Sequence, residues 1–349
     1  MATALRKSSK FLMIGLAAYL FAGCDIVPGF GGDDSEPVVD LYPVLIDGDW
    51  GYINSKGRIQ VEPDFSWTGD FSEGVAPARS GYYYGYVDSQ GEFVIDNRFE
   101  WAGPFSDGLA LVRFDGRYGF INKRGEFSIN PIYTDGYSFS NGRAFIRTQD
   151  YYWEYVDKSG NIIRNEDTPE FREHEAPGFI SGIALVQDNG GNWGYIDESS
   201  RPVIPLQYTS ARTFSEGRAA IKISDRWGYI NADQSTAISP QFISAGDFGD
   251  GLAPVRKDDN QWGYINTSGN VVIESQFDQA LSFYEGRAAV QLNGRWGYID
   301  TSGNMITEYI FDEVSSFKNG LARIVQLIDD DERLGYIDRS GKFVWYPTD

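Results

Sequence analysis

Few residues in this sequence have the types and spacing that catalysis requires. The 349 residues include one histidine, His174, and one cysteine, Cys24. Thiol and serine–histidine mechanisms need a histidine base beside the nucleophile, so a chain with one histidine and no cysteine after position 24 is poorly equipped for them. A Gly-Lys-Ser/Thr motif that would cradle a phosphate is absent. We therefore predict a protein that is not an enzyme and that uses no cofactor.

Acidic segments are the places where metal ligands gather. The segment around the histidine offers Glu170, Glu173, His174 and Glu175. Adjacent side chains of a strand or helix do not converge on one ion, so this set is a poor metal site. The runs Asp329 to Glu332 and Asp33 to Glu36 lack the alternating oxygen ligands and the glycine of a dedicated calcium loop. We expect solvated charged loops and predict no metal site.

Two tryptophans, Trp67 and Trp101, form the pattern that most suggests ligand binding. Each stands seventeen residues after an aromatic residue, Trp50 or Tyr84, that opens a copy of a repeated motif. Other copies place polar residues in that slot: Asp135, Ser210, Ser244, Gln279 and Glu313. A slot that accepts such residues faces solvent, so we expect two exposed, neighbouring tryptophans that can stack on a sugar or anchor a protein partner. The competing interpretation is that the two rings pack on each other and have no further role.

The first residues predict export and membrane attachment. Three basic residues precede an apolar run from Phe11 to Phe21 that is too short to span a bilayer as a helix. The run ends in Phe-Ala-Gly-Cys at Cys24, which resembles the lipobox of bacterial lipoproteins. The resemblance implies that residues 1–23 are a signal peptide and that Cys24 is the lipidation site. The protein would then be a lipid-anchored membrane protein of the bacterial cell envelope, on its periplasmic or surface face; the alternative is a soluble secreted protein with an incidental cysteine.

Composition separates a tether from the body of the chain and narrows the class of partner. Residues 24–40 are rich in Gly, Pro, Asp, Ser and Glu and have little to bury, which is typical of a flexible linker. The net charge of the whole chain is −20. Because this charge repels phosphate backbones, we predict no nucleic-acid partner, and we expect a monomer with a well-solvated surface.

A repeat of about 34 residues governs the sequence after position 40. Each copy opens with an aromatic residue followed by Gly or its substitute, and the opening residues are Trp50, Tyr84, Tyr118, Trp153, Trp193, Trp227, Trp262, Trp296 and Leu334. In the copy at Trp262 the pattern predicts a strand from 262 to 265, a turn at Gly269, a strand from 271 to 273 and a third strand from 288 to 292. Each copy is thus a three-stranded antiparallel meander that cannot bury its face alone, so neighbouring copies share a core.

The second half of each copy repeats two aromatic residues and a glycine, as in Phe277, Phe283 and Gly286. The full pattern, Trp-Gly-Tyr-Ile-Asp-x-x-Gly followed by Phe-x-x-Ala-x-x-Phe-Ser-Glu-Gly-x-Ala, resembles the WG (KWG) repeat of bacterial surface and secreted proteins. The resemblance covers about residues 41 to 349 and implies a β-repeat domain, but it brings no catalytic residues with it. Three departures from the pattern are places where function could have been added: Glu154, which is followed by an acidic insertion from Asn165 to Pro177, and Ser200 and Gln234 in place of the turn glycine.

The ends of the repeat region favour a closed ring. Residues 41–48 align with the third strand of a copy, and the chain ends in a second strand without a third. These two pieces could complete one shared blade, so we predict an all-β, propeller-like ring of eight to nine copies closed by the terminal strands. The alternative is an open β-solenoid whose incomplete copies act as caps.

These observations predict a lipid-anchored interaction scaffold that binds a protein or a glycan through loops on one face. Two alternatives stay open. One is a carbohydrate-active enzyme that uses paired carboxylates on a propeller, which rests on fold analogy alone. The other is a structural envelope spacer without a specific ligand.

Overall fold

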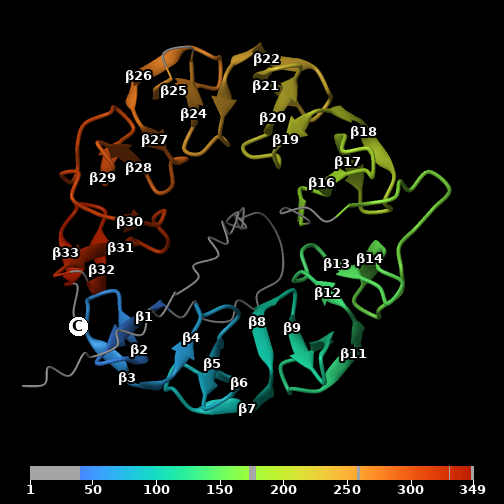
Figure 1. Cartoon of the computed structure of the whole chain (residues 1–349), viewed down its shortest axis with the longest axis vertical. Helices are drawn as coiled ribbons and strands as arrows, with labels where there is room; N and C mark the ends of the chain where they lie inside the picture. The colour runs from blue at the N-terminus through green and yellow to red at the C-terminus, as the bar shows by residue number, and fades with distance from the viewer. Residues whose placement is uncertain (1–39, 173–177, 258–259, 330, 347–349) are drawn as a thin grey trace, which may run out of the picture. The chain divides into compact units, whose positions relative to one another are not determined.

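The computed structural model describes residues 40–172, 178–257, 260–329 and 331–346. All regular structure in these residues is β-strand, and the strands form nine separate antiparallel sheets. Figure 1 shows the sheets arranged around a ring, as the blades of a propeller, and we number the blades 1 to 9 along the chain. The predicted all-β class and the predicted ring are confirmed. No helix in the described part of the chain is long and apolar enough to cross a bilayer.

The strands of each blade follow one another in chain order. Blades 1 to 3 comprise β1 (Leu41–Ile46), β2 (Asp49–Asn54) and β3 (Ile59–Phe65); β4 (Trp67–Thr68), β5 (Ala76–Ser80), β6 (Tyr83–Val87) and β7 (Phe93–Phe99); and β8 (Trp101–Ser106), β9 (Leu109–Phe114), β10 (Arg117–Ile121) and β11 (Phe127–Tyr133). Blades 4 to 6 comprise β12 (Asp135–Gly136), β13 (Arg143–Arg147) and β14 (Trp153–Asp157); β15 (Phe179–Ile180), β16 (Ile183–Gln187), β17 (Trp193–Asp197) and β18 (Pro202–Tyr208); and β19 (Ser210–Ala211), β20 (Arg218–Ile223), β21 (Arg226–Asn231) and β22 (Thr236–Phe242). Blades 7 to 9 comprise β23 (Ser244–Ala245), β24 (Leu252–Arg256), β25 (Trp262–Asn266) and β26 (Val271–Phe277); β27 (Gln279–Ala280), β28 (Arg287–Leu292) and β29 (Arg295–Asp300); and β30 (Glu313–Val314), β31 (Leu321–Ile328), β32 (Asp331–Asp338) and β33 (Phe343–Trp345).

Most blades have four strands rather than the three that the sequence predicts. The additional strand is a short first strand of two residues in most four-stranded blades, such as β23, which pairs with β24 through Ser244 and Ala245. Two paired residues leave no alternating pattern in a sequence, so this strand escapes prediction. A blade therefore begins in the second half of one sequence copy and ends with the Trp-Gly hairpin of the next.

The motif tyrosines hold neighbouring blades together. The second aromatic residue of each motif is buried, and these residues are Tyr52, Tyr86, Phe120, Tyr155, Tyr195, Tyr229, Tyr264, Tyr298 and Tyr336. The hydroxyl of Tyr264 donates a hydrogen bond of 2.7 Å to the backbone oxygen of Leu281 in the next blade, and its ring lies 4.8 Å from that of Phe283. Burial raises the pKa of each of the eight tyrosines above its ordinary value. The prediction that each copy shelters its neighbour's rings is confirmed.

The glycine of the motif leaves room for the outer strand of its own blade. In blade 7, Trp262 pairs with Phe277 and Tyr264 with Ile273, so the outer strand bulges over the glycine between them. A Cβ on Gly263 would lie 2.5 Å from the backbone oxygen of Ile273, closer than real contacts allow. The glycine is therefore required by the bulge and not by its backbone angles.

The ring closes through packing between blades 1 and 9. Tyr336 donates a hydrogen bond of 2.8 Å to the backbone oxygen of Pro43, and Tyr42 donates one of 2.6 Å to that of Asn319. The turn at Gly57 lies against Val344, just as the turn at Gly303 lies against Ile273 in an internal joint. The predicted shared blade is wrong, because β1 pairs with β2 and β33 completes its own blade as the outer strand.

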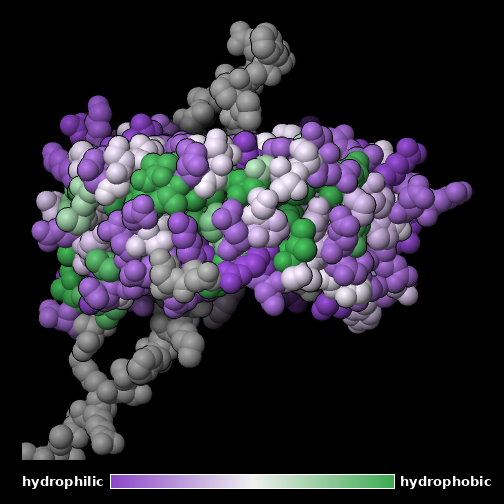
Figure 2. All heavy atoms as spheres, turned by 90° about the horizontal axis from the view of Figure 1, so that it is seen from above, coloured by the Kyte–Doolittle hydropathy of each residue, from purple (hydrophilic) through white to green (hydrophobic). Residues whose placement is uncertain are grey.

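The outer strands expose some apolar side chains on the wall of the ring. Figure 2 shows hydrophobic patches there between hydrophilic side chains, and Val203, Val271 and Val272 are among the exposed residues. Proline occupies the outer strands of several blades, at Pro63 and Pro131 for example. Proline cannot donate a backbone hydrogen bond, so these edges are protected against pairing with another sheet.

Candidate functional site

Repeat equivalence places the candidate residues on one face of the ring. In every blade the turn before the Trp-Gly strand lies at the same end of the sheet, since the strand order is the same throughout. We call the ring surface formed by these turns the hairpin face. Trp67 pairs with Arg79 next to the turn of blade 2, and Trp101 pairs with Arg113 next to the turn of blade 3. Both predicted site residues therefore lie on the hairpin face, in neighbouring blades.

Each of the two tryptophans packs within its own blade. The ring of Trp67 lies 5.5 Å from that of Tyr84, and the ring of Trp101 lies 6.1 Å from that of Tyr118, both edge to face. Glycine two residues later makes room for each ring: a Cβ on Gly103 would lie 2.8 Å from Trp101. Trp101 remains 37% exposed and Trp67 is half-buried. Their function in binding stays a prediction.

In both blades an arginine on the strand between the tryptophan and the tyrosine lies over the tyrosine ring. The guanidinium of Arg79 lies 5.6 Å from the ring centre of Tyr84, and that of Arg113 lies 5.9 Å from that of Tyr118. Arg113 also pairs with Glu100 at 3.3 Å. Such rows combine flat aromatic surface with a hydrogen-bonding cation, which suits a ligand that has both apolar faces and oxygen atoms.

Exposed tyrosines extend this surface at the tips of two hairpins. Tyr82 and Tyr83 in blade 2 are 93% and 50% exposed, and Tyr151 and Tyr152 in blade 4 are 66% and 58% exposed. At the same tips, blades 6 and 8 have polar turns. We call the aromatic set on blades 2 to 4 the aromatic arc; its members are the half-buried Trp67 and the exposed Tyr82, Tyr83, Trp101, Tyr151 and Tyr152.

The arc ends at a groove between blades 4 and 5. The groove has a volume of about 460 Å³ and is lined by Arg147, Tyr151, Tyr152, Trp153, Phe171, Arg172 and Asn189. Its volume lies within the range of small-molecule sites. The lining contains two arginines and no carboxylate, although the chain as a whole is strongly acidic.

The groove exists because blade 4 departs from the repeat. Glu154 replaces the motif glycine, and its side chain would occupy the space where the outer strand bulges in other blades. Blade 4 has no outer strand; the chain makes a single bridge at Ile162 and continues into the insertion. Within the insertion, Phe171 pairs with Trp153, just as Phe277 pairs with Trp262 in blade 7. Phe171 therefore takes the place of the first aromatic residue in the second half of the motif. Sequence reasoning missed Phe171 because the insertion shifts its spacing.

Glu154 is buried beside Arg164, the residue that precedes the insertion. Its carboxylate accepts a hydrogen bond of 2.6 Å from Arg164 Nη2, and its side chain is 9% exposed. Burial raises the pKa of Glu154, and the charge of Arg164 opposes that rise. This pair supports the local structure of blade 4 and does not line the groove.

The two substituted turn glycines have structural functions. Ser200 and Gln234 keep positive φ angles of 60° and 68°. Ser200 donates a hydrogen bond of 3.0 Å to the backbone oxygen of Ile163, and Gln234 donates one of 2.9 Å to that of Val203. Both bonds reach the preceding blade, where the turn glycines of other copies make close contact. The suggestion that these two departures carry added function stays a prediction.

Several predicted residues lie outside the described residues, namely Cys24, Glu173, His174 and Glu175. Glu170 is described, and it accepts a hydrogen bond of 2.7 Å from the side chain of Asn189. Among the residues that the structure describes, no group of three or more His, Cys, Asp or Glu side chains is placed to hold a metal ion.

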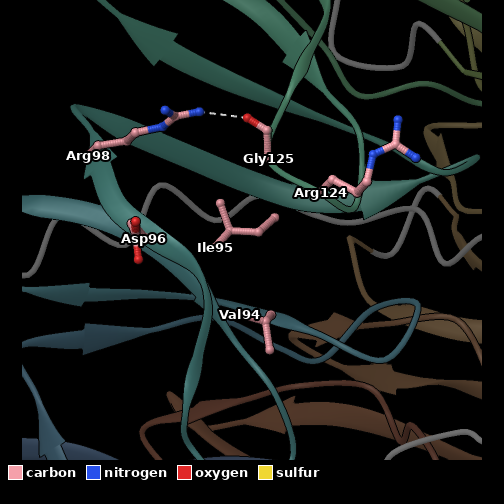
Figure 3. A pocket seen from close by; sticks show the side chains of 6 residues that line it. All are labelled: Val94, Ile95, Asp96, Arg98, Arg124 and Gly125. Atoms are coloured by element: carbon pink, nitrogen blue, oxygen red, sulfur yellow. Dashed lines mark hydrogen bonds between the residues drawn. The ribbon is translucent and has the colours of Figure 1, made fainter.

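A smaller cavity of about 160 Å³ lies between blades 2 and 3, lined by Val94, Ile95, Asp96, Arg98, Arg124 and Gly125 (Figure 3). Arg98 donates a hydrogen bond of 2.6 Å to the backbone oxygen of Gly125 across it. A Cβ on Gly125 would lie 2.8 Å from Ile95, so this is the ordinary contact between a turn and the preceding blade. We attribute this cavity to blade packing.

Comparison with known proteins identifies the repeat. The family described as WG containing repeat matches residues 50–84, 84–118, 118–153, 193–227, 227–260, 262–296 and 296–326. The gap in these matches coincides with Glu154 and the insertion. No curated protein matches the sequence.

Solved structures resemble the chain in fold. A crystal structure of the eukaryotic initiation factor has a TM-score of 0.60 at 9% identity, covering 87% of this chain and 94% of that chain. BamB from Moraxella catarrhalis has a TM-score of 0.44 at 10% identity, and the match covers 84% of this chain and 95% of that chain. The computationally designed Ika8 protein has a TM-score of 0.45 at 12% identity, and the match covers 79% of this chain and 94% of that chain. At such identities the likeness concerns the fold alone.

Proposed function

The chain belongs to the WG containing repeat family, and from this premise we propose that it is a non-enzymatic, lipid-anchored scaffold of the bacterial envelope that binds a glycan on its hairpin face. The observation that carries the proposal is the aromatic arc. Six aromatic side chains project from three consecutive blades, whereas equivalent slots elsewhere hold residues such as Ser210 and Ser244. Glycans offer apolar ring faces and hydroxyl groups, and the arc offers aromatic faces next to arginines.

The charge environment supports binding rather than glycoside hydrolysis. Hydrolysis needs two carboxyl groups on either side of the scissile bond, one of them with a raised pKa. Among the residues that the structure describes, burial raises the pKa of two acids, Glu154 and Asp247, and an arginine accompanies each, Arg164 at 2.6 Å and Arg212 at 3.5 Å. Neither acid lines the groove.

The chain enters the ring from the face opposite the arc. The first strand, β1, ends at the turn of Asp47 and Gly48, which belongs to the hairpin face. Its first residue, Leu41, therefore lies at the other end of the blade.

Glycan binding is tested with an array followed by calorimetry. The mature protein is compared with the Trp67→Ala/Trp101→Ala variant and with a control, Ser210→Ala/Ser244→Ala, that changes the same slot in blades 6 and 7. We expect the tryptophan variant to bind at least about tenfold more weakly, a loss of about 1.4 kcal/mol, and the control to bind like the wild type. Equal binding by all three would remove the tryptophans from the site. Binding of an envelope protein but of no glycan would replace the proposed partner class.

The anchor is tested separately by mass spectrometry of the amino-terminal peptide and by cell fractionation. We expect a diacylglyceryl modification on Cys24 and release of the Cys24→Ser variant from the membrane fraction, because stable anchoring needs more than one acyl chain. An unmodified Cys24 in a membrane-associated protein would refute lipid anchoring.

A further inference from the structure

We infer that the groove between blades 4 and 5 is a specific subsite for a carboxylated sugar, such as a uronic acid residue of an acidic glycan. The inference deepens the proposed function and rests on it for the ligand class. Its geometry, however, depends on residues other than Trp67 and Trp101, so the two can be tested apart.

The aromatic side of the groove is rigid. Trp153 and Phe171 are 6% and 5% exposed and form its floor. Trp153 stacks on Phe145 with ring centres 4.9 Å apart, so its position is fixed from below. Above this floor, Tyr151 and Tyr152 project from the hairpin tip and are more than half exposed. They offer flat apolar surface for the faces of a sugar ring.

The polar side of the groove is held by blade 5. The backbone amide of Arg172 donates a hydrogen bond of 2.9 Å to the oxygen of Gln187, which fixes the chain beside the adjacent blade. Asn189 donates its side-chain amide to Glu170 at 2.7 Å. This bond uses the amide nitrogen and leaves the amide oxygen of Asn189 to accept from a ligand hydroxyl.

The two arginines provide the positive charge. The guanidinium of Arg147 lies 4.9 Å from the ring centre of Tyr151, and its Nε is buried without a hydrogen-bond partner in the described structure. Among the described residues, neither Arg147 nor Arg172 forms an ion pair, whereas Arg113 and Arg164 pair with glutamates. A groove lined by two such arginines attracts an anion even though the whole chain is acidic and the carboxylate of Glu170 borders the groove through Asn189.

Functional-group geometry favours a carboxylated sugar over a bare anion. The guanidinium fork matches a carboxylate with two parallel hydrogen bonds. The exposed tyrosines add a contact that a small inorganic anion cannot use. A glycan with about one carboxylate per ring combines a charge for the arginines with ring faces for the tyrosines.

The test is calorimetric titration of the mature protein with tri-galacturonate, with maltotriose as the neutral comparison. We expect tri-galacturonate to bind and maltotriose to bind at least about tenfold more weakly at this site. Arg147→Gln and Arg172→Gln should each weaken tri-galacturonate binding at least about tenfold. Arg256→Gln is the matched control, because Arg256 lies over Trp262 at 5.9 Å in the equivalent place of blade 7 and also has a buried Nε without a partner. It should leave binding unchanged.

The outcomes separate this inference from the proposed function. Tri-galacturonate binding that survives in Trp67→Ala/Trp101→Ala and is lost in Arg147→Gln supports the groove as a subsite of its own. Binding of neutral glycans without any preference for tri-galacturonate overturns the inference and leaves the proposed function intact. Equal competition by inorganic phosphate or by a glutamate tripeptide also overturns it, because the site would then select charge alone. Absence of binding to any glycan refutes both.

Discussion

Replacing Tyr336 by phenylalanine should open the ring at its seam. The change removes the hydroxyl that donates to the buried backbone oxygen of Pro43 and leaves that oxygen without this partner. Losing such a bond costs about 1 to 3 kcal/mol. The edge-to-face contact between the rings of Tyr42 and Tyr336, whose centres lie 5.6 Å apart, does not need the hydroxyl and should persist. The loss therefore isolates the hydrogen bond.

The assay is hydrogen exchange followed by mass spectrometry. In the described residues, blades 1 and 9 are joined by side-chain hydrogen bonds and ring packing. The weakened seam should therefore raise exchange in β1–β3 and β30–β33 by about 10- to 100-fold. The control is Tyr264→Phe, which removes the same bond at 2.7 Å from an internal joint where the chain itself connects the two blades. It should raise exchange near that joint and leave the seam unchanged. Unchanged seam exchange in Tyr336→Phe, or an equal rise in every blade, would refute the closure argument.

Three further predictions concern stability. Gly263→Ala should destabilise the protein by about 3 kcal/mol or more in urea unfolding, because its Cβ would meet the oxygen of Ile273 at 2.5 Å. Gly294→Ala, at a φ of 78° with open space around it, should cost about 1 kcal/mol. Similar losses of stability in the two variants would contradict the bulge explanation. Alkaline titration followed by circular dichroism should show cooperative unfolding above about pH 10, because burial raises the pKa of the eight motif tyrosines. Each such tyrosine removes about 1.4 kcal/mol of stability per pH unit between its unfolded-state and its folded-state pKa. A fold that stays intact at pH 12 would count against this prediction. Glu154→Gln should be at least as stable as the wild type at pH 7, and the difference in stability should shrink near pH 4. The reason is that a carboxyl with a raised pKa contributes most to folding stability below its unfolded-state pKa. Strong destabilisation at pH 7 would show that the bond to Arg164 outweighs the cost of burying the charge.

The repeat allowed much of the fold to be predicted, and particular residues show where prediction stopped. Trp262, Gly263 and Tyr264 predict a strand with a gap on one face, and the structure fills that gap with the bulge of the outer strand. The two-residue strand that opens most four-stranded blades was not predicted, because a pair of residues has no periodicity. Phe171 was missed as a member of the aromatic series, because the insertion changed its distance from Trp153.

The candidate site was predicted in part. Trp67 and Trp101 stood out because the same slot holds polar residues in other copies, and both lie on the hairpin face. The groove could not be predicted from their spacing, because it joins the tip of one blade to an insertion and to the turn of the next. Tyr151 and Tyr152, which the repeat spacing does not single out, are among the most exposed aromatic residues in the described part of the chain.

The sequence by itself determined that this is a β-repeat protein with a period of about 34 residues, because aromatic residues, turn glycines and alternating strands are local features that recur at fixed distances. Only the tertiary structure decided that the blades close into a ring of nine and that two arginines face the same groove. Both outcomes depend on contacts between residues far apart in the chain: Tyr336 with Pro43, and the hairpin of Tyr151 with Arg172. Spacing along the chain does not encode the angle between successive blades, and that angle sets which distant residues meet.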